Sequence, residues 1–192
     1  MSTPEVSGKA FLGIVRYVKD ARGDEALRAL VERAPGPTRD VFRRQIRATD
    51  WHPYDAYAAL LRLLERELGG GDKGFSRALG AAAGKRDLGS IFRVYTVLAS
   101  AERLIRACDK VWPSYYRNAG EMRAVSWSPE DTRLRISGFS GMDPAHCRLM
   151  EGWMISTMAM IGFRVSDDAR ETACASRGAA FHEFACSWTK IR

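Results

Sequence analysis

The 192-residue sequence contains only four cysteines and three histidines. A chain of this length can bury a core without disulfides, so we expect the cysteines to be reduced thiols. The longest uncharged apolar stretch, 152–163, is shorter than the roughly 20 residues that cross a bilayer. Lys9, Arg16 and Lys19 interrupt the apolar residues near the N-terminus, which argues against a signal peptide. We therefore expect a cytoplasmic protein without a membrane span.

Motifs of common enzyme classes are also missing. The sequence has no Gly-x-Ser-x-Gly, no His-Glu-x-x-His and no dinucleotide-binding glycine motif after a predicted strand. The glycine-rich stretch 69–74 follows a predicted helix, and Phe75 stands where a phosphate-binding loop has Lys. We therefore expect a protein that is not an enzyme.

Positive charge is in excess, with 30 Lys and Arg against 23 Asp and Glu. Most cations are dispersed beside acidic residues, as on solvated helix faces. The one dense run is Arg39, Arg43, Arg44 and Arg47, which we interpret as either an anion-binding patch or a solvated face, with Arg43 and Arg47 on one side of a helix. No RNA-binding aromatic motif, paired-cysteine finger or basic zipper accompanies this run, so nucleic acid is not expected as a partner.

The N-terminal part of the chain, 8–118, has a helical hydrophobic period. Apolar residues recur at three- and four-residue steps, which predicts five helices. The clearest begins after Pro53 and stops at the glycines that follow Leu68, and the last runs from Leu88 to near Trp112.

The C-terminal part, 120–190, changes to a two-residue period. Asp143 and Pro144 open one core helix, as an N-cap and a first-turn residue. The strands that we expect around this helix are 122–127, 132–137, 163–174 and 179–189. No repeat or linker divides the chain. The sequence therefore predicts a single α+β domain over 1–192, in which a helical N-terminal half packs on a four-stranded antiparallel sheet with one interposed core helix.

Four side chains near the C-terminus are of the types that tetrahedral zinc accepts, namely Cys147, Glu171, Cys174 and His182. Glu171 and Cys174 lie on opposite faces of a regular strand, so both can bind one ion only if a bulge or the start of a turn intervenes. His146 and Cys186 are reserve ligands. Without a metal, Glu171 and His182 could instead form a charge-assisted hydrogen bond across the hairpin.

This C-terminal segment resembles the vinyl-reductase-type domain, including the version that forms the sensor of phenol- and xylene-responsive transcription activators. The resemblance rests on the run from Glu171 to His182, with Cys174 and Gly178 inside it, following the helix that begins near Cys147. In that family a similar pattern holds a structural zinc beside an aromatic-effector pocket. The resemblance implies that Cys147, Glu171 and Cys174 match three ligands and that His182 takes the place of a fourth, a Cys in the family.

The whole-chain outline also resembles an uncharacterised myxobacterial-type paralogous family, with Gly13, Gly80 and Trp188 among the matching positions. Both groups are similar in fold to vesicle-tethering subunits of the TRAPP type and, more distantly, to haem-nitric-oxide sensors. The relatives that hold haem use a proximal histidine and an aromatic-Ser-Arg contact to the propionates. This chain has no such triplet, so haem is not expected, and structural zinc is the candidate cofactor.

Aromatic and methionine side chains provide a candidate ligand pocket. They could line a cavity for an apolar or aromatic ligand, or simply fill the core. These residues are Phe92, Tyr95, Trp153, Met154, Met158, Phe184 and Trp188.

Two functions remain open from the sequence. The first is a non-catalytic protein-interaction or regulatory module that acts through a protein partner or a homodimer, as the TRAPP-like resemblance implies. The alternative is a sensory domain that binds a small apolar or aromatic ligand and has a structural zinc. The absence of an output domain favours the first.

Overall fold

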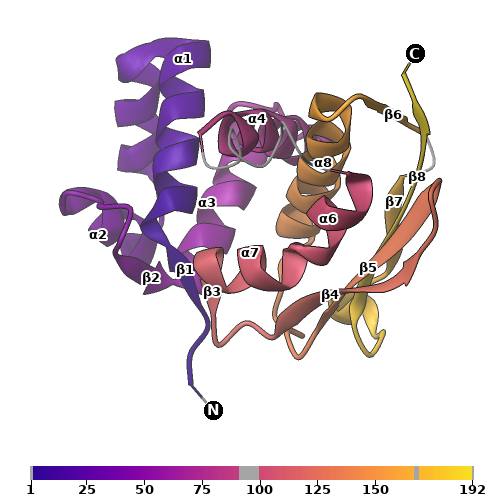
Figure 1. Ribbon diagram of the computed structural model, residues 1–192. Coiled ribbons are helices and arrows are strands. Elements are labelled where there is room, and N and C mark those ends of the chain that lie inside the picture. Colours follow the sequence, from indigo (N-terminus) through magenta and orange to yellow (C-terminus); the bar gives the residue numbers. More distant parts are fainter. Residues whose placement is uncertain (1, 91–99, 167–168, 192) are drawn as a thin grey trace.

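We analysed a computed structural model of the chain, which describes residues 2–90, 100–166 and 169–191. Figure 1 shows a group of N-terminal helices on one side, an antiparallel sheet on the other, and α8 (Pro144–Met160) between them. The α+β class and the interposed helix that the sequence predicts are therefore confirmed.

The helical layer begins with α1 (Gly8–Arg33), whose first turn is capped by the side chain of Ser7. Gly23 has φ of 83° and breaks α1 into the two helices that the sequence predicts. The remaining helices of the layer are α2 (Gly36–Arg43), α3 (Tyr54–Glu67), α4 (Gly74–Ser90), α6 (Ala101–Arg106) and α7 (Cys108–Tyr115).

The predicted helix from Leu88 to Trp112 differs from the structure at both ends. Helix α4 continues to Ser90, and the later part is divided into α6 and α7 at Ala107. The side chain of Ser100 accepts a hydrogen bond from the backbone N–H of Arg103 and so begins α6 as a new helix.

A small sheet that the sequence analysis missed joins the N-terminus to the helical layer. Its strands are β1 (Glu5–Ser7), β2 (Trp51–Pro53) and β3 (Tyr116–Arg117), in the order β2-β1-β3. Strands of two or three residues carry too few positions to show a two-residue period, which explains why they were missed.

The larger sheet has five strands, not the four that were predicted. Strands β4 (Glu121–Trp127), β5 (Asp131–Ser137) and β8 (His182–Lys190) lie side by side in this order, and each neighbouring pair is antiparallel. The predicted strand 163–174 forms two short ones, β6 (Phe163–Val165) and β7 (Arg170–Ala173), which both pair with β8. Strand β8 is therefore the centre of this sheet, and His182, Phe184, Cys186 and Trp188, which alternate along it, are buried.

Helices α4 and α8 cross in direct backbone contact at three glycines. A Cβ atom at Gly152 would lie 1.8 Å from the carbonyl oxygen of Arg77, and one at Gly80 would lie 1.9 Å from that of Leu149. A Cβ at Gly84 would meet the hydroxyl of Ser156 at 2.1 Å. Only glycine permits this approach, so the seam fixes α8 against the helical layer.

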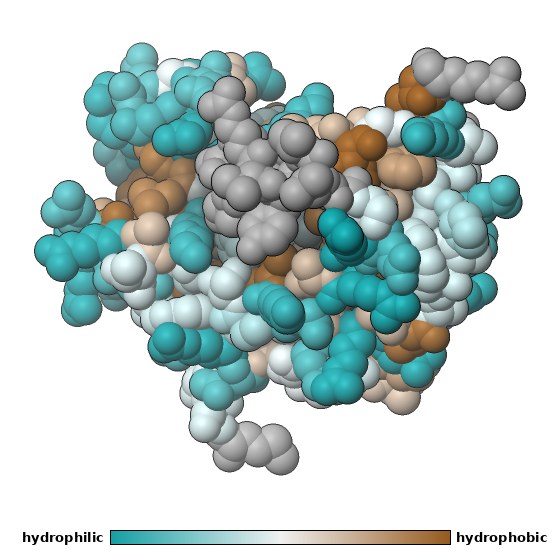
Figure 2. Space-filling model, in the orientation of Figure 1, coloured by the Kyte–Doolittle hydropathy of each residue, from teal (hydrophilic) through white to brown (hydrophobic). Residues whose placement is uncertain are grey.

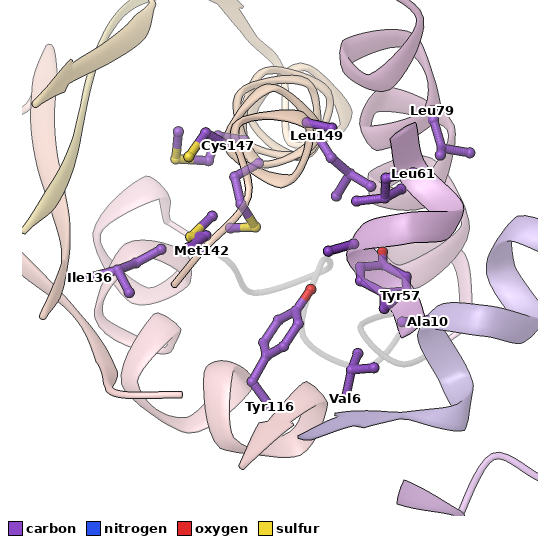
Figure 3. Packing of buried hydrophobic residues seen from close by; sticks show 14 of the residues in the cluster. Val6, Ala10, Tyr57, Leu61, Leu79, Tyr116, Ile136, Met142, Cys147 and Leu149 are labelled. Carbon is purple, nitrogen blue, oxygen red and sulfur yellow. The ribbon is translucent and has the colours of Figure 1, made fainter. Parts of the chain in front are cut away.

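The core extends across both layers. Figure 3 shows side chains of α1, α3, α8 and the sheet meeting around α8, with Tyr116 pointing inward from its strand. On the face shown in Figure 2, the surface is mainly hydrophilic and the hydrophobic areas are separate. Within the described ranges no helix has the length and apolarity required to cross a membrane.

Candidate functional site

A central cavity of about 60 Å³ lies between the helical layer, α8 and the start of the larger sheet. Its wall is mainly apolar and aromatic. The lining residues come from α1, α3, α4, α7, α8, β3 and β4 and are Ala10, Gly13, Ile14, Tyr57, Leu79, Ala83, Arg86, Val111, Trp112, Tyr115, Tyr116, Met122, Leu149, Met150 and Trp153.

A second, smaller cavity of about 20 Å³ lies between α6, α7, α8 and the larger sheet. Its wall includes Cys108, Met154, Met158 and Cys186. Trp153 lines both cavities.

The predicted pocket residues are therefore divided among different places. Trp153 lines the central cavity, whereas Met154 and Met158 line only the second one. Phe184 and Trp188 are buried in the core but line neither cavity. The other two, Phe92 and Tyr95, lie outside the described residues.

His146 forms a buried support behind the central cavity. Its ring is fully buried, with Nδ1 3.0 Å from the hydroxyl of Tyr54 and Nε2 2.8 Å from the hydroxyl of Tyr116. The backbone N–H of Asp143 donates to the same Tyr54 oxygen at 2.9 Å. The indole of Trp112 stacks on the imidazole with centroids 6.2 Å apart. His146 therefore holds two cavity-lining rings, Tyr116 and Trp112, in place.

Burial determines the protonation state of this support. It lowers the pKa of His146 to about 3, with a smaller contribution from His182, so the imidazole is neutral at physiological pH. Burial also raises the pKa of Tyr54 well above its usual value. A neutral imidazole accepts at one nitrogen and donates at the other, which matches two hydroxyl partners.

On the opposite side of α8, the four predicted metal ligands converge. The ligand atoms of Cys147, Glu171, Cys174 and His182, here named the C-terminal cluster, all lie within 4.8 Å of one another. Nδ1 of His182 is 3.4 Å from Sγ of Cys147 and 3.1 Å from Oε1 of Glu171. The other ring nitrogen lies 3.1 Å from the carbonyl oxygen of Phe139. A backbone carbonyl at that nitrogen leaves Nδ1 to face the cluster, as in many metal-binding histidines.

A β-bulge makes this convergence possible. The register of β7 against β8 shifts between Glu171 and Ala173, and Cys174 then begins a short 3-10 helix, Ala175–Arg177. These two features turn Glu171 and Cys174 toward the same point, as the sequence analysis required of any shared site.

Hydrogen bonds determine the charge within the C-terminal cluster. Burial alone would raise the pKa of Glu171, but the hydrogen bonds with His182, Cys147 and Cys174 and the charge of Arg177 outweigh it, and its pKa lies below the usual range. Burial, and then the bond to Glu171, raises the pKa of Cys147. Without a cation the cluster therefore contains a carboxylate and a protonated Cys147 thiol. A metal ion would release that proton.

The predicted arginine patch does not form one face. Helix α2 ends at Arg43, so Arg44 and Arg47 follow it in extended and turn segments. Arg43 pairs with Asp40 at 3.0 Å, and Arg39 donates to the carbonyl of Ala34. The structure thus places the four cations apart from both cavities and from the C-terminal cluster.

The sequence analysis missed the residues that shape the central cavity. Tyr57, Tyr116 and Arg86 line it, yet their spacing in the sequence is that of ordinary helix and strand residues. The signal that could have found them is indirect: Gly13 and Gly80 interrupt helical stretches where a glycine costs stability.

The fold is that of an α+β domain with a cavity between its helical layer and α8, the helix that backs its larger sheet. Among solved structures it is similar to H-NOX proteins. An H-NOX protein from S. oneidensis in its Fe(II)NO ligation state has a TM-score of 0.73 at 12% identity, over 96% of this chain and 99% of that chain. The unliganded Fe(II) H-NOX protein from K. algicida has a TM-score of 0.72 at 9% identity, over 96% and 97%.

No family model and no curated protein matches the sequence. At such identities the structural likeness shows the fold alone. The comparisons do not show the predicted vinyl-reductase-type or TRAPP-type assignment.

The comparisons correct the expectation about cofactors. Haem was excluded and zinc was named, but the similar structures are haem proteins, one of them from work on haem distortion in the H-NOX family with a TM-score of 0.65 at 9% identity. The exclusion was wrong because it relied on a short propionate motif, whereas the fold persists without recognisable sequence similarity. The neighbours lend zinc no support.

None of the three histidines offers haem a ligand in the central cavity. His146 and His182 have both ring nitrogens engaged, and His52, which packs on Phe11, does not line the central cavity. Histidine-ligated haem therefore does not fit the described residues as they lie. Tyr57 and Tyr116 line the cavity, but the hydroxyl of Tyr116 is bonded to Nε2 of His146.

Proposed function

We propose that this protein is a sensory domain that binds a small, mainly apolar ligand in the central cavity. The observation that carries the proposal is the cavity itself, which is apolar, lies between two layers and is braced by buried polar bonds. The fold supports it, because a similar structure is an H-NOX protein described in its Fe(II)NO ligation state. This is the alternative of the sequence analysis, and it now stands ahead of the protein-interaction module.

Helix α8 is the element through which occupancy would be transmitted. Leu149, Met150 and Trp153 line the central cavity, whereas Cys147 belongs to the C-terminal cluster. Arg148 forms two hydrogen bonds of 2.9 and 2.8 Å with the carboxylate of Glu65 on α3. A ligand that displaces the side chains of Leu149, Met150 or Trp153 therefore acts on a helix that contacts both the helical layer and the sheet.

A matched pair of cavity variants tests the proposal. Ala83→Leu places three extra carbon atoms at the cavity wall, whereas Ala82→Leu makes the same change one residue away on α4, outside the lining. Ligand-observed NMR with butanone and xenon should show binding to the wild type and to Ala82→Leu, and at least about tenfold weaker binding to Ala83→Leu, equal to about 1.4 kcal/mol.

Two results decide the proposal. Equal binding by both variants, or no binding by the wild type, would reject the cavity as the ligand site. A parallel titration with haemin, followed by absorbance, establishes whether the ligand that the wild type takes up is haem. Loss of that uptake in Ala83→Leu would place haem in the same cavity.

We also propose that the C-terminal cluster binds a metal ion. Two thiols, an imidazole and a carboxylate meet there. They come from α8, from β8, and from β7 and the residue that follows it. The carbonyl oxygen of Phe139 orients the imidazole of His182. Such an ion would tie α8 to the sheet on the side away from the central cavity.

A further inference from the structure

Arg86 brings a permanent positive charge to the wall of the central cavity. It is the one charged residue among the lining residues that the structure describes. Its side chain comes from α4 and is half-buried.

A glycine on the facing helix makes room for this guanidinium. A Cβ atom at Gly13 would lie 2.5 Å from Nη2 and 2.7 Å from Nη1 of Arg86, closer than atoms can approach. Gly13 itself lines the cavity. Two independent observations, the cavity wall and the glycine contact, therefore place the guanidinium at the same point.

The rest of the wall is mainly aromatic and aliphatic. Tyr57, Tyr115 and Tyr116 contribute aromatic rings, and Ile14, Leu149 and Met150 contribute aliphatic surface. A carboxylate is the anion that matches a guanidinium best, because its two oxygens accept parallel N–H bonds. The attraction is stronger in an apolar cavity than in water.

We propose that the ligand of the central cavity is a short-chain carboxylate, held at its charged end by Arg86 and along its chain by the apolar wall. The inference rests on the proposed function, since it names the ligand class of the same cavity. The cavity volume of about 60 Å³ is small, so butyrate is a suitable probe of this ligand class.

Butyrate and butyramide test this charge, because they have nearly the same shape and differ in charge. NMR titration of the full chain should show butyrate binding at least about tenfold more tightly than butyramide. Arg86→Gln should weaken butyrate about ten- to a hundredfold and leave butyramide within about threefold. Arg86→Lys should recover part of the loss, and Gly13→Ala should weaken butyrate by displacing the guanidinium without removing it.

Arg16→Gln is the matched control, because Arg16 is an exposed arginine of α1 that loses the same charge outside the cavity. It should bind butyrate like the wild type. Equal affinity of the wild type for the acid and the amide, or an equal loss of both in Arg86→Gln, would overturn the carboxylate while leaving the apolar-ligand proposal standing. If neither compound binds and butanone does not bind either, both proposals fail.

Discussion

The two sides of α8 are built on opposite principles. The side that faces the helical layer is apolar, is closed by backbone contact at Gly152 and Gly80, and leaves a cavity of about 60 Å³. The side that faces the sheet buries polar groups, and His182 has a partner at each ring nitrogen. One helix, α8, thus contributes residues to a mainly apolar cavity on one side and to a cluster of hydrogen-bonded polar groups on the other.

The glycine seam should be the most sensitive part of this arrangement. Gly152→Ala places a Cβ 1.8 Å from the backbone oxygen of Arg77, so the helices must separate. We expect a loss of about 3 kcal/mol in the free energy of unfolding, measured by urea denaturation. Gly141→Ala, with no atom within 4 Å of the new carbon, should change it by less than about 0.5 kcal/mol. Similar values for the two variants would show that the seam is not rigid.

Metal removal tests the opposite side of α8. We expect one metal ion per chain by elemental analysis, and a stabilisation of about 2.7 kcal/mol when the free metal concentration is 100 times Kd. A chelator should remove both the ion and the stabilisation. Cys174→Ser should lose the ion, whereas Cys108→Ser, a buried cysteine on α7 outside the cluster, should keep it. Metal-free wild type after refolding with divalent metal salts would refute the site.

Buried His146 should make the free energy of unfolding depend on pH. Its pKa is about 3 in the folded chain and about 6.5 when unfolded, so between these values the unfolded chain binds the extra proton. Stability from His146 is therefore present above about pH 6.5 and lost as the pH falls toward 3, at up to about 1.4 kcal/mol per pH unit. We expect the free energy of unfolding, measured by urea denaturation at pH 6.5, 5.5 and 4.5, to fall less steeply with decreasing pH in His146→Gln than in the wild type. The same slope in both proteins would contradict the prediction.

The sequence predicted the sheet side of α8 far better than the helical side. Cys147, Glu171, Cys174 and His182 are chemically distinctive, and the requirement for a bulge follows from strand alternation, so their convergence could be anticipated. A cavity is a volume without atoms, and residue types do not distinguish a filled interior from a hollow one. For this reason Trp153 is the one predicted pocket residue in the described part of the chain that lines the central cavity.

The fold was predictable where segments are long. Helix α3 and the β4–β5 hairpin match their hydrophobic periods, whereas the strands of the small sheet are too short to have one. The division of the predicted strand 163–174 into β6 and β7 depends on where β8 offers partners, which is a tertiary property. Haem was misjudged for a related reason, since a fold can persist at 9–12% identity after its motifs have changed.

Trp153 forms part of the wall of both cavities, and the smaller one reaches Leu134 and Cys186 on the sheet. A single residue of α8 therefore contributes to the space beside the helical layer and to the space beside the sheet. A substitution at Trp153 alters both cavities at once, whereas a substitution at Leu149 or Met154 alters only one of them.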